Sequence, residues 1–132
     1  MAASCAETDI HRRLLIVEDD PASCEAMSDV LGDLGFAVLC ASTDREAYAR
    51  LTTTSNLAGL IVDVNLGPGT TGFDVARFAR QLHPDLPVLY VTGEASQESF
   101  KAFGVPDSEY IAKPYGVGEL LRLVQSRIAA ND

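Results

Sequence analysis

Residues 14–21 read LLIVEDDP, an aliphatic run that ends abruptly in three acidic residues and a proline. An uninterrupted aliphatic run bounded by polar residues is typical of a short strand that is buried on both faces. Asp20 followed by Pro21 combines a helix N-cap with the residue favoured at the first helical position. The stretch therefore predicts a buried strand that leads through an acidic turn directly into a helix.

The same alternation of a short apolar run and a helical pattern repeats along the rest of the chain. Apolar runs predict further strands at 36–40, 57–63, 87–91 and 109–112, each followed by apolar residues at helical spacing. Residues typical of helix boundaries lie between these units: Gly35, the capping-box pair Thr43 and Glu46, Gly72, Pro84 and Gly104. The helix at about 95–103 has the weakest pattern.

Five strand–helix units predict an α/β protein whose parallel sheet is covered by helices on both faces. Because the crossovers between parallel strands are right-handed, few topologies remain. The leading one is the flavodoxin-like (βα)5 fold, a doubly wound five-stranded parallel sheet with strand order 2-1-3-4-5.

Composition limits the classes of function. The chain has 132 residues, which suits one domain, and we expect residues 1–12 to form a flexible tail and 13–132 to form the domain. The net charge of −9 argues against a nucleic-acid partner. No apolar segment is long enough to span a membrane, and residues 1–11 lack the features of a signal peptide, so we expect a cytoplasmic protein.

The cysteines point to the same compartment. Cys5, Cys24 and Cys40 are odd in number, widely spaced and form no CxxC motif. This pattern favours free thiols in a reducing cytosol over a disulfide framework or a zinc site.

Polar residues gather where ligands of such folds are expected. In open parallel sheets, ligands bind beyond the carboxyl ends of the strands, at the point where the strand order reverses. Here Glu18, Asp19 and Asp20 follow the first strand, Asp63 ends the third, Thr92 follows the fourth and Lys113 follows the fifth. Crowded carboxylates repel one another and attract a hard divalent cation such as Mg²⁺. An aspartate beside such a cation, an ammonium and a hydroxyl is equipped to receive a phosphoryl group.

With these residues identified, the chain resembles the receiver domain of bacterial two-component response regulators, of the stand-alone, single-domain type. The resemblance covers essentially all of residues 13–132. It is carried by the stretches LLIVEDDP, LIVDVNLGPGTTGFDVA, LPVLYVTGE and YIAKPY.

The resemblance implies a role for each residue of the acidic group. Asp63 matches the phosphoacceptor and a ligand of Mg²⁺ or Mn²⁺. Asp19 is expected to hold the ion directly and Glu18 through water. The backbone carbonyl of Asn65 would be the remaining protein ligand. Asp20 is explained at least as well by helix capping.

The remaining site residues are assigned by the same resemblance. Thr92 matches the residue whose hydroxyl moves to hydrogen-bond the phosphoryl group, and Lys113 matches the lysine that the family has after its fifth strand. Tyr110 matches an aromatic rotamer switch, although a half-buried strand tyrosine is an equally good interpretation. The Lys113-Pro114 peptide is expected to be cis.

The resemblance also implies a signalling mechanism. A histidine kinase or histidine phosphotransfer protein would donate the phosphoryl group to Asp63. The face formed by the helix at 95–103, the strand at 109–112 and the last helix would then repack and bind a downstream protein. The protein would be a monomer or a phosphorylation-dependent dimer. It would not be an enzyme beyond self-catalysed phosphotransfer and autodephosphorylation.

Several features depart from the family pattern and leave alternatives open. The loop at 64–72 is one residue longer than the commonest form, and 104–108 lacks the usual Gly-Ala pair. The chain could be the excised receiver of a hybrid histidine kinase, or a receiver fold that is an interaction module and is never phosphorylated. Residues 67–72 fit GxGxxG, so a dinucleotide-binding enzyme is a remote alternative.

Overall fold

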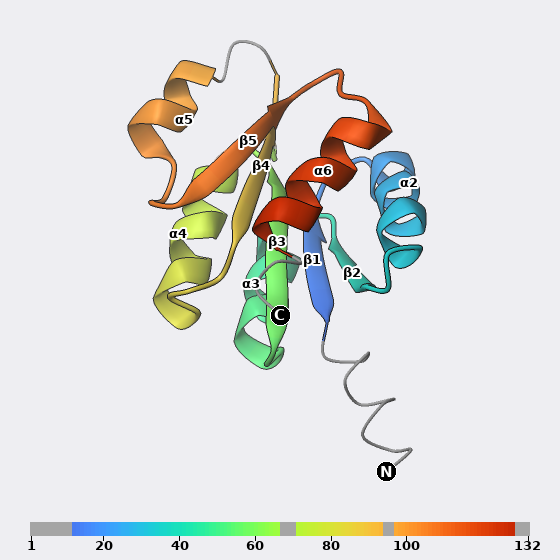
Figure 1. Cartoon of the computed structure of the whole chain (residues 1–132). Helices are drawn as coiled ribbons and strands as arrows, with labels where there is room; N and C mark the ends of the chain where they lie inside the picture. Colours follow the sequence, from blue (N-terminus) through green and yellow to red (C-terminus); the bar gives the residue numbers. More distant parts are fainter. Residues whose placement is uncertain (1–11, 67–70, 94–96, 129–132) are drawn as a thin grey trace.

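A computed structural model describes residues 12–66, 71–93 and 97–128 of the chain. Strands and helices alternate along it (Figure 1). The strands are β1 (Arg13–Val17), β2 (Ala37–Ala41), β3 (Leu57–Asp63), β4 (Val88–Thr92) and β5 (Ser108–Ala112). The helices are α2 (Pro21–Gly32), α3 (Asp44–Thr53), α4 (Gly72–Leu82), α5 (Gln97–Phe103) and α6 (Val117–Arg127).

The strands form one five-stranded parallel sheet in the order β2-β1-β3-β4-β5, which confirms the predicted fold class and topology. Helices α2 and α6 cover one face of the sheet, and α3, α4 and α5 cover the other (Figure 1). Each face has its own apolar core. The core strands β1, β3 and β4 contribute to both cores because their side chains alternate between the two faces.

Helix boundaries follow the predicted signals with local differences. Pro21 begins α2, and Gly35 lies beyond its end with a φ of 97°, a value that favours glycine. The Thr43 side chain accepts a hydrogen bond from the Glu46 N–H at 3.1 Å, as a capping box requires. The Glu46 carboxylate, however, accepts from the N–H of Ser42 at 2.7 Å instead of from Thr43. The expected start of α5 near residue 95 lies outside the described residues.

The ends of the domain can be described only in part. Residues 1–11 of the expected tail lie outside the described residues. The carbonyl of Arg12 accepts a hydrogen bond from the Ala37 N–H, and its guanidinium lies 4.7 Å from the centroid of the Phe36 ring. Among the described helices, none has the combination of length and hydropathy that crossing a bilayer would require.

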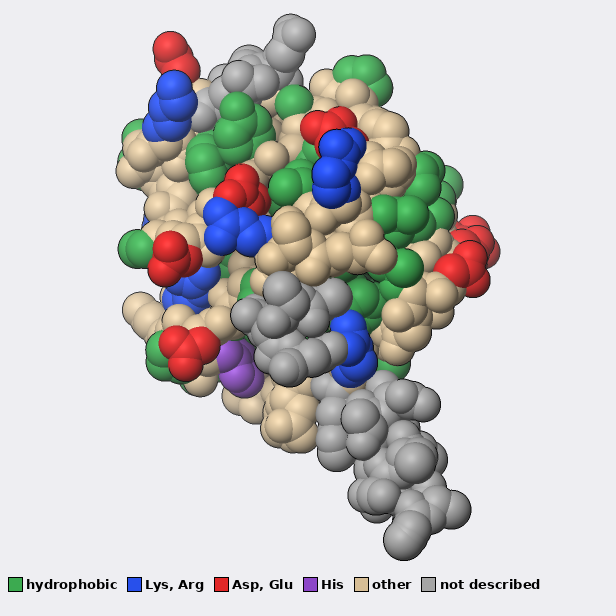
Figure 2. Space-filling view, viewed as in Figure 1, with side chains coloured by type: hydrophobic (Ala, Val, Ile, Leu, Met, Phe, Trp, Pro, Cys, Tyr) green, Lys and Arg blue, Asp and Glu red, His purple; other side chains and the backbone are tan. Residues whose placement is uncertain are grey.

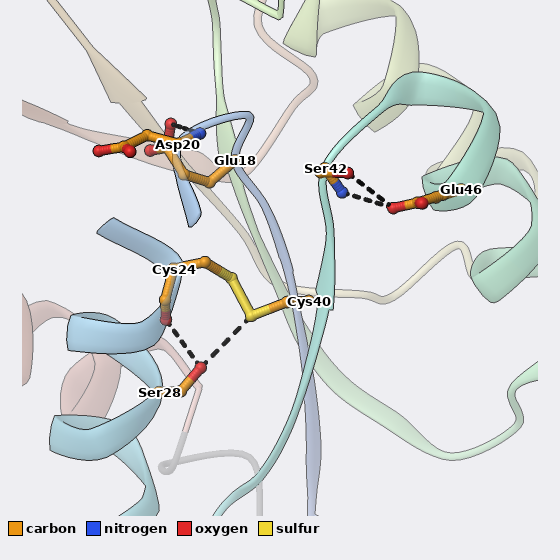
Figure 3. The surroundings of a disulfide bond; sticks show 7 residues. All are labelled: Glu18, Asp20, Cys24, Ser28, Cys40, Ser42 and Glu46. Carbon is orange, nitrogen blue, oxygen red and sulfur yellow. Dashed lines mark hydrogen bonds between the residues drawn. A yellow bond between two sulfur atoms is a disulfide. The ribbon is translucent and has the colours of Figure 1, made fainter. Parts of the chain in front are cut away.

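The expectation of free cysteines is wrong for two of the three. Cys24 in α2 and Cys40 in β2 are joined by a disulfide, with their Cα atoms 6.4 Å apart (Figure 3). Spacing along the chain gave no sign of this bond, because the crossover from α2 to β2 brings together residues that are 16 positions apart. Cys5 lies outside the described residues. The disulfide removes the cysteine-based argument for a reducing compartment.

Gly72 allows the start of α4 to approach the end of β3. A Cβ atom at this position would lie 2.3 Å from the backbone oxygen of Asp63 and 3.0 Å from the Cα of Val64. The N–H of Gly72 donates to the Val64 carbonyl at 2.8 Å, which fixes this approach. No side chain larger than hydrogen fits here without displacing the backbone that carries Asp63.

We therefore expect Gly72→Ala to lower the free energy of unfolding by about 1–3 kcal/mol, since an overpacked site forces backbone shifts. Gly118 in α6 is the matched control, because a Cβ there meets no atom within 4 Å. Gly118→Ala should leave stability unchanged or raise it slightly, because alanine is the better helix former. Urea unfolding of both variants and the wild type measures the difference. Equal stability of the two variants would contradict the steric account of Gly72.

Candidate functional site

Three carboxylates meet at the carboxyl edge of the sheet. Glu18 and Asp19 follow β1, and Asp63 ends β3, which pairs with β1 so that Val17 lies opposite Val62. One carboxylate oxygen from each acid can be chosen such that all three lie within 4.8 Å of one another. The parallel pairing of β1 and β3 therefore brings together residues that are 44 or 45 positions apart along the chain.

Lys113 brings a positive charge to this acidic cluster of Glu18, Asp19 and Asp63. Its Nζ lies 3.1 Å from Oδ2 of Asp63 and 3.8 Å from Oε1 of Glu18. The backbone N–H of Lys113 donates to the Thr92 carbonyl at 2.8 Å, which places the end of β5 beside the end of β4. The Lys113-Pro114 peptide is cis, as expected.

Glu18 is a buried acid whose hydrogen bonds are incomplete. Its side chain is 2% exposed, and Oε2 accepts a hydrogen bond from the Asp20 N–H at 3.2 Å. Among the described residues, Oε1 has no hydrogen-bond partner, because Lys113 is too distant to donate. A buried carboxylate oxygen without a partner is costly, and a cation beside it would remove that cost.

Burial and the neighbouring charge of Asp63 raise the pKa of Glu18 to about 7 from its ordinary 4.5. The Asp20 N–H and the Lys113 ammonium act in the opposite direction and limit the rise. Burial would lower the pKa of Lys113, but the hydrogen bond and charge of Asp63, together with the charge of Glu18, outweigh it and raise this pKa. Lys113 is thus held in its charged form, while the cluster keeps excess negative charge for a second cation.

Glu18 should make the stability of the metal-free protein depend on pH. Between about pH 4.5 and 7 the folded protein retains a proton on Glu18 that the unfolded chain has lost. The free energy of unfolding therefore falls as pH rises through this range. In EDTA we expect the free energy of unfolding, relative to Glu18→Gln, to fall by about 2 kcal/mol between about pH 5 and pH 7.5. Urea unfolding of both proteins at the two pH values measures it. A difference that does not change with pH would contradict the raised pKa.

Asn65, two residues after Asp63, contacts the carboxylate of that aspartate. The backbone N–H of Asn65 donates to Oδ1 of Asp63 at 3.0 Å. Asn65 also pairs with Thr71 in an isolated β-bridge. This hydrogen bond orients the carboxylate and leaves Oδ2 facing Lys113. The role of the Asn65 carbonyl as a metal ligand stays a prediction, and 67–70 of the long loop lie outside the described residues.

Thr92 is the last residue of β4, one position beyond the strand expected at 87–91, and Tyr110 lies within the strand expected at 109–112. Neither contacts the acidic cluster through a hydrogen bond among the described residues. Thr92 is fully buried, and its hydroxyl donates to the Gly93 carbonyl at 3.0 Å. Tyr110 is half-buried, and its ring packs against Phe100 of α5 with centroids 4.7 Å apart. Both switch roles stay predictions.

Asp20 lies outside the acidic cluster. It occupies the N-cap position of α2, and its exposed carboxylate accepts a hydrogen bond from the Ser23 hydroxyl at 2.7 Å. That hydrogen bond holds the pKa of Asp20 below its usual range. Asp20 therefore lies at the N-cap position that the sequence predicts, although its side chain makes no capping hydrogen bond to the helix backbone.

Tyr115 is a residue of the site that the sequence did not single out. Burial raises the pKa of Tyr115, the charge of Lys113 lowers it, and the charges of Glu18 and Asp63 raise it further. The ring also packs against the core between the sheet and helices α2 and α6. Its position two residues after Lys113 does not by itself show that Tyr115 lies in range of these charges.

Comparison with known proteins gives consistent matches. The sequence model of the response regulator receiver domain family matches residues 14–125. The transcriptional regulatory protein CusR of Escherichia coli K12 is 30% identical over 115 residues, which cover 86% of this chain and 50% of CusR. The chain therefore spans about half the length of the curated relatives it matches.

Solved structures match over nearly the whole chain. The crystal structure of a response regulator receiver protein from Sinorhizobium medicae gives a TM-score of 0.84 at 27% identity, over 92% of this chain and 97% of that one. The chemotaxis protein CheY4 of Vibrio cholerae gives a TM-score of 0.76 at 30% identity, over 88% of this chain and 98% of its own.

Proposed function

The chain belongs to the response regulator receiver domain family, and from this premise we propose that it accepts a phosphoryl group on Asp63 in two-component signalling. The donor would be a phosphohistidine on a histidine kinase or a histidine phosphotransfer protein. The observation that carries this proposal is the position of Asp63: its Oδ2 lies 3.1 Å from the Lys113 ammonium, inside a group of three carboxylates.

The acidic cluster fits a divalent cation. Glu18, Asp19 and Asp63 offer carboxylate oxygens, and the Asn65 carbonyl would complete the protein ligands. Oε1 of Glu18 has no hydrogen-bond partner among the described residues, and the Lys113 ammonium 3.8 Å away is too distant to supply one. When bound, Mg²⁺ or Mn²⁺ would neutralise charge on the non-bridging oxygens of the phosphoryl group. Because the pKa of Glu18 is about 7, its carboxylate would release a proton when the ion binds at neutral pH.

The side chains then have distinct tasks in phosphoryl transfer. A carboxylate oxygen of Asp63 attacks phosphorus, the new O–P bond forms as the P–N bond to imidazole breaks, and the imidazole leaves and takes a proton from solvent. Lys113, already paired with Asp63, balances the charge that develops on the phosphoryl oxygens. The Thr92 hydroxyl would exchange its bond to the Gly93 carbonyl for one to the phosphoryl group.

The signal would leave through the face formed by α5, β5 and α6. Lys113 follows β5 directly, and Tyr110 of β5 contacts Phe100 of α5, so a shift at the site has a packed route to this face. Phe103 is 58% exposed and Val117 is 54% exposed, which offers apolar contacts to a protein partner. Figure 2 shows that hydrophobic side chains in this view reach the surface among acidic and basic ones.

Incubation with acetyl phosphate and Mg²⁺, followed by intact-mass measurement, tests the proposal. We expect a gain of one phosphoryl group with Mg²⁺ and no gain in EDTA. No gain in either condition would contradict it and would instead favour a receiver fold that acts only as an interaction module. An equal gain in both conditions would contradict the role of the divalent cation.

A further inference from the structure

The disulfide lies close to the acidic loop, defined here as Glu18, Asp19 and Asp20. Cys24 is the fourth residue of α2 and is buried, whereas Cys40 is exposed in β2, at the edge of the sheet. Figure 3 shows Glu18 and Asp20 near the α2 end of this bond. The disulfide thus joins the start of α2, the helix that follows the acidic loop, to β2.

Two backbone hydrogen bonds and the disulfide enclose the acidic loop in a ring. The Glu18 N–H donates to the carbonyl of Ala41, the residue next to Cys40, at 3.0 Å. The Cys24 N–H donates to the Asp20 carbonyl at 3.1 Å. One end of the loop, Glu18, is therefore bonded to the residue next to Cys40, and the other end, Asp20, is bonded to Cys24. The disulfide between the two cysteines closes the ring covalently.

The disulfide adds a covalent link near the start of α2, where side-chain capping is incomplete. The Asp20 side chain makes no capping hydrogen bond to the helix backbone and instead accepts from the Ser23 hydroxyl. β2 is an edge strand, and among the described residues it pairs only with β1. Of the α2 side chains buried in the core, Cys24, Met27 and Leu31, only Cys24 lies near the start of the helix, so loss of the disulfide would affect that end of α2 most.

We propose that the Cys24–Cys40 disulfide is a redox-sensitive brace that holds the acidic loop in its cation-binding arrangement. The proposal rests on the proposed function insofar as it names the cation site of Glu18, Asp19 and Asp63. Opening the brace would leave the fold intact, loosen the acidic loop and weaken the binding of divalent cations.

The chemistry requires a dithiol as the reductant. A thiolate of the dithiol attacks the sulfur of Cys40, the exposed partner, and the Cys24 sulfur leaves as a thiolate and takes a proton. The second thiol of the reductant then displaces Cys40, which also takes a proton. In total the protein gains two electrons and two protons, and the dithiol becomes a disulfide. The Ser28 hydroxyl, 3.4 Å from the Cys40 sulfur, is placed to hydrogen-bond the released thiol.

The test compares oxidised and dithiothreitol-reduced protein in a Cys5→Ser background, so that only the pair can react. Thiol titration of the folded protein establishes the two states, and amide hydrogen exchange and Mn²⁺ titration compare them. On reduction we expect exchange of the Glu18 and Cys24 amides to accelerate about tenfold. We expect the affinity for Mn²⁺ to fall about fivefold. The Cys24→Ser/Cys40→Ser variant is the control and should behave as reduced protein with or without dithiothreitol.

Three results would overturn the proposal. One is the presence of two titratable thiols before reduction. Another is unchanged exchange of the Glu18 and Cys24 amides after reduction. The third is equal Mn²⁺ affinity in two forms that both bind the ion. If neither form binds Mn²⁺, the proposed function fails at its cation site, and amide exchange alone decides whether the brace exists.

Discussion

Asp63→Asn protein, incubated with acetyl phosphate and Mg²⁺, is expected to gain no phosphoryl group under conditions that phosphorylate the wild type. The asparagine amide has nearly the same size, but its oxygen is a poor nucleophile. We expect the rate of phosphorylation to fall about a thousandfold or more, as when other catalytic nucleophiles are removed. Intact-mass measurement over time gives the rate for each protein.

Asp20→Asn is the matched control for this experiment. Asp20 belongs to the same edge of the sheet and loses the same charge, but it lies outside the acidic cluster and bonds to Ser23. This variant should be phosphorylated at close to the wild-type rate. Phosphorylation of Asp63→Asn at a rate near that of the wild type would contradict the assignment of the acceptor.

Lys113→Ala should slow phosphorylation about a hundredfold or more, because it removes a fixed positive charge from the place where charge develops on the phosphoryl oxygens. The variant also loses the 3.1 Å contact with Asp63 and the charge that lowers the pKa of Glu18. The pKa of Glu18 should therefore rise above about 7. Phosphorylation rates at several Mg²⁺ concentrations separate the loss of rate from any change in metal affinity.

Lys101 provides the control, because it is the other lysine of the chain and is exposed in α5. Lys101→Ala removes the same charge from the protein at a position away from the acidic cluster. Its phosphorylation rate should match that of the wild type. If the phosphorylation rates of both lysine variants fell by the same factor, net charge would explain the effect. That result would contradict a specific role for Lys113.

The fold and the location of the site could be predicted because they depend on patterns along the chain. Short apolar runs that end in polar residues specify a parallel sheet, and a parallel sheet brings Glu18, Asp63, Thr92 and Lys113 to one edge. The contact between Lys113 and Asp63 then follows from the neighbouring positions of strand ends.

Other features depend on distances and burial that no residue pattern encodes. The Cys24–Cys40 bond needs a helix and an edge strand to meet with the right geometry, so the spacing of the cysteines was misleading. The partnerless oxygen of Glu18 reflects how deeply that side chain is buried. Tyr115 is part of the site because its ring lies within range of three charges, and its position in the sequence alone does not reveal this.

Chemical trapping of the phosphorylated residue tests the central claim most directly. Borohydride reduces an aspartyl phosphate to homoserine, so protein treated with acetyl phosphate and Mg²⁺ can be reduced, digested and sequenced by mass spectrometry. The account predicts homoserine at position 63, dependent on both the phosphodonor and Mg²⁺. Homoserine at position 19 or 20 instead, or at no position in a protein that has gained a phosphoryl group, would contradict it.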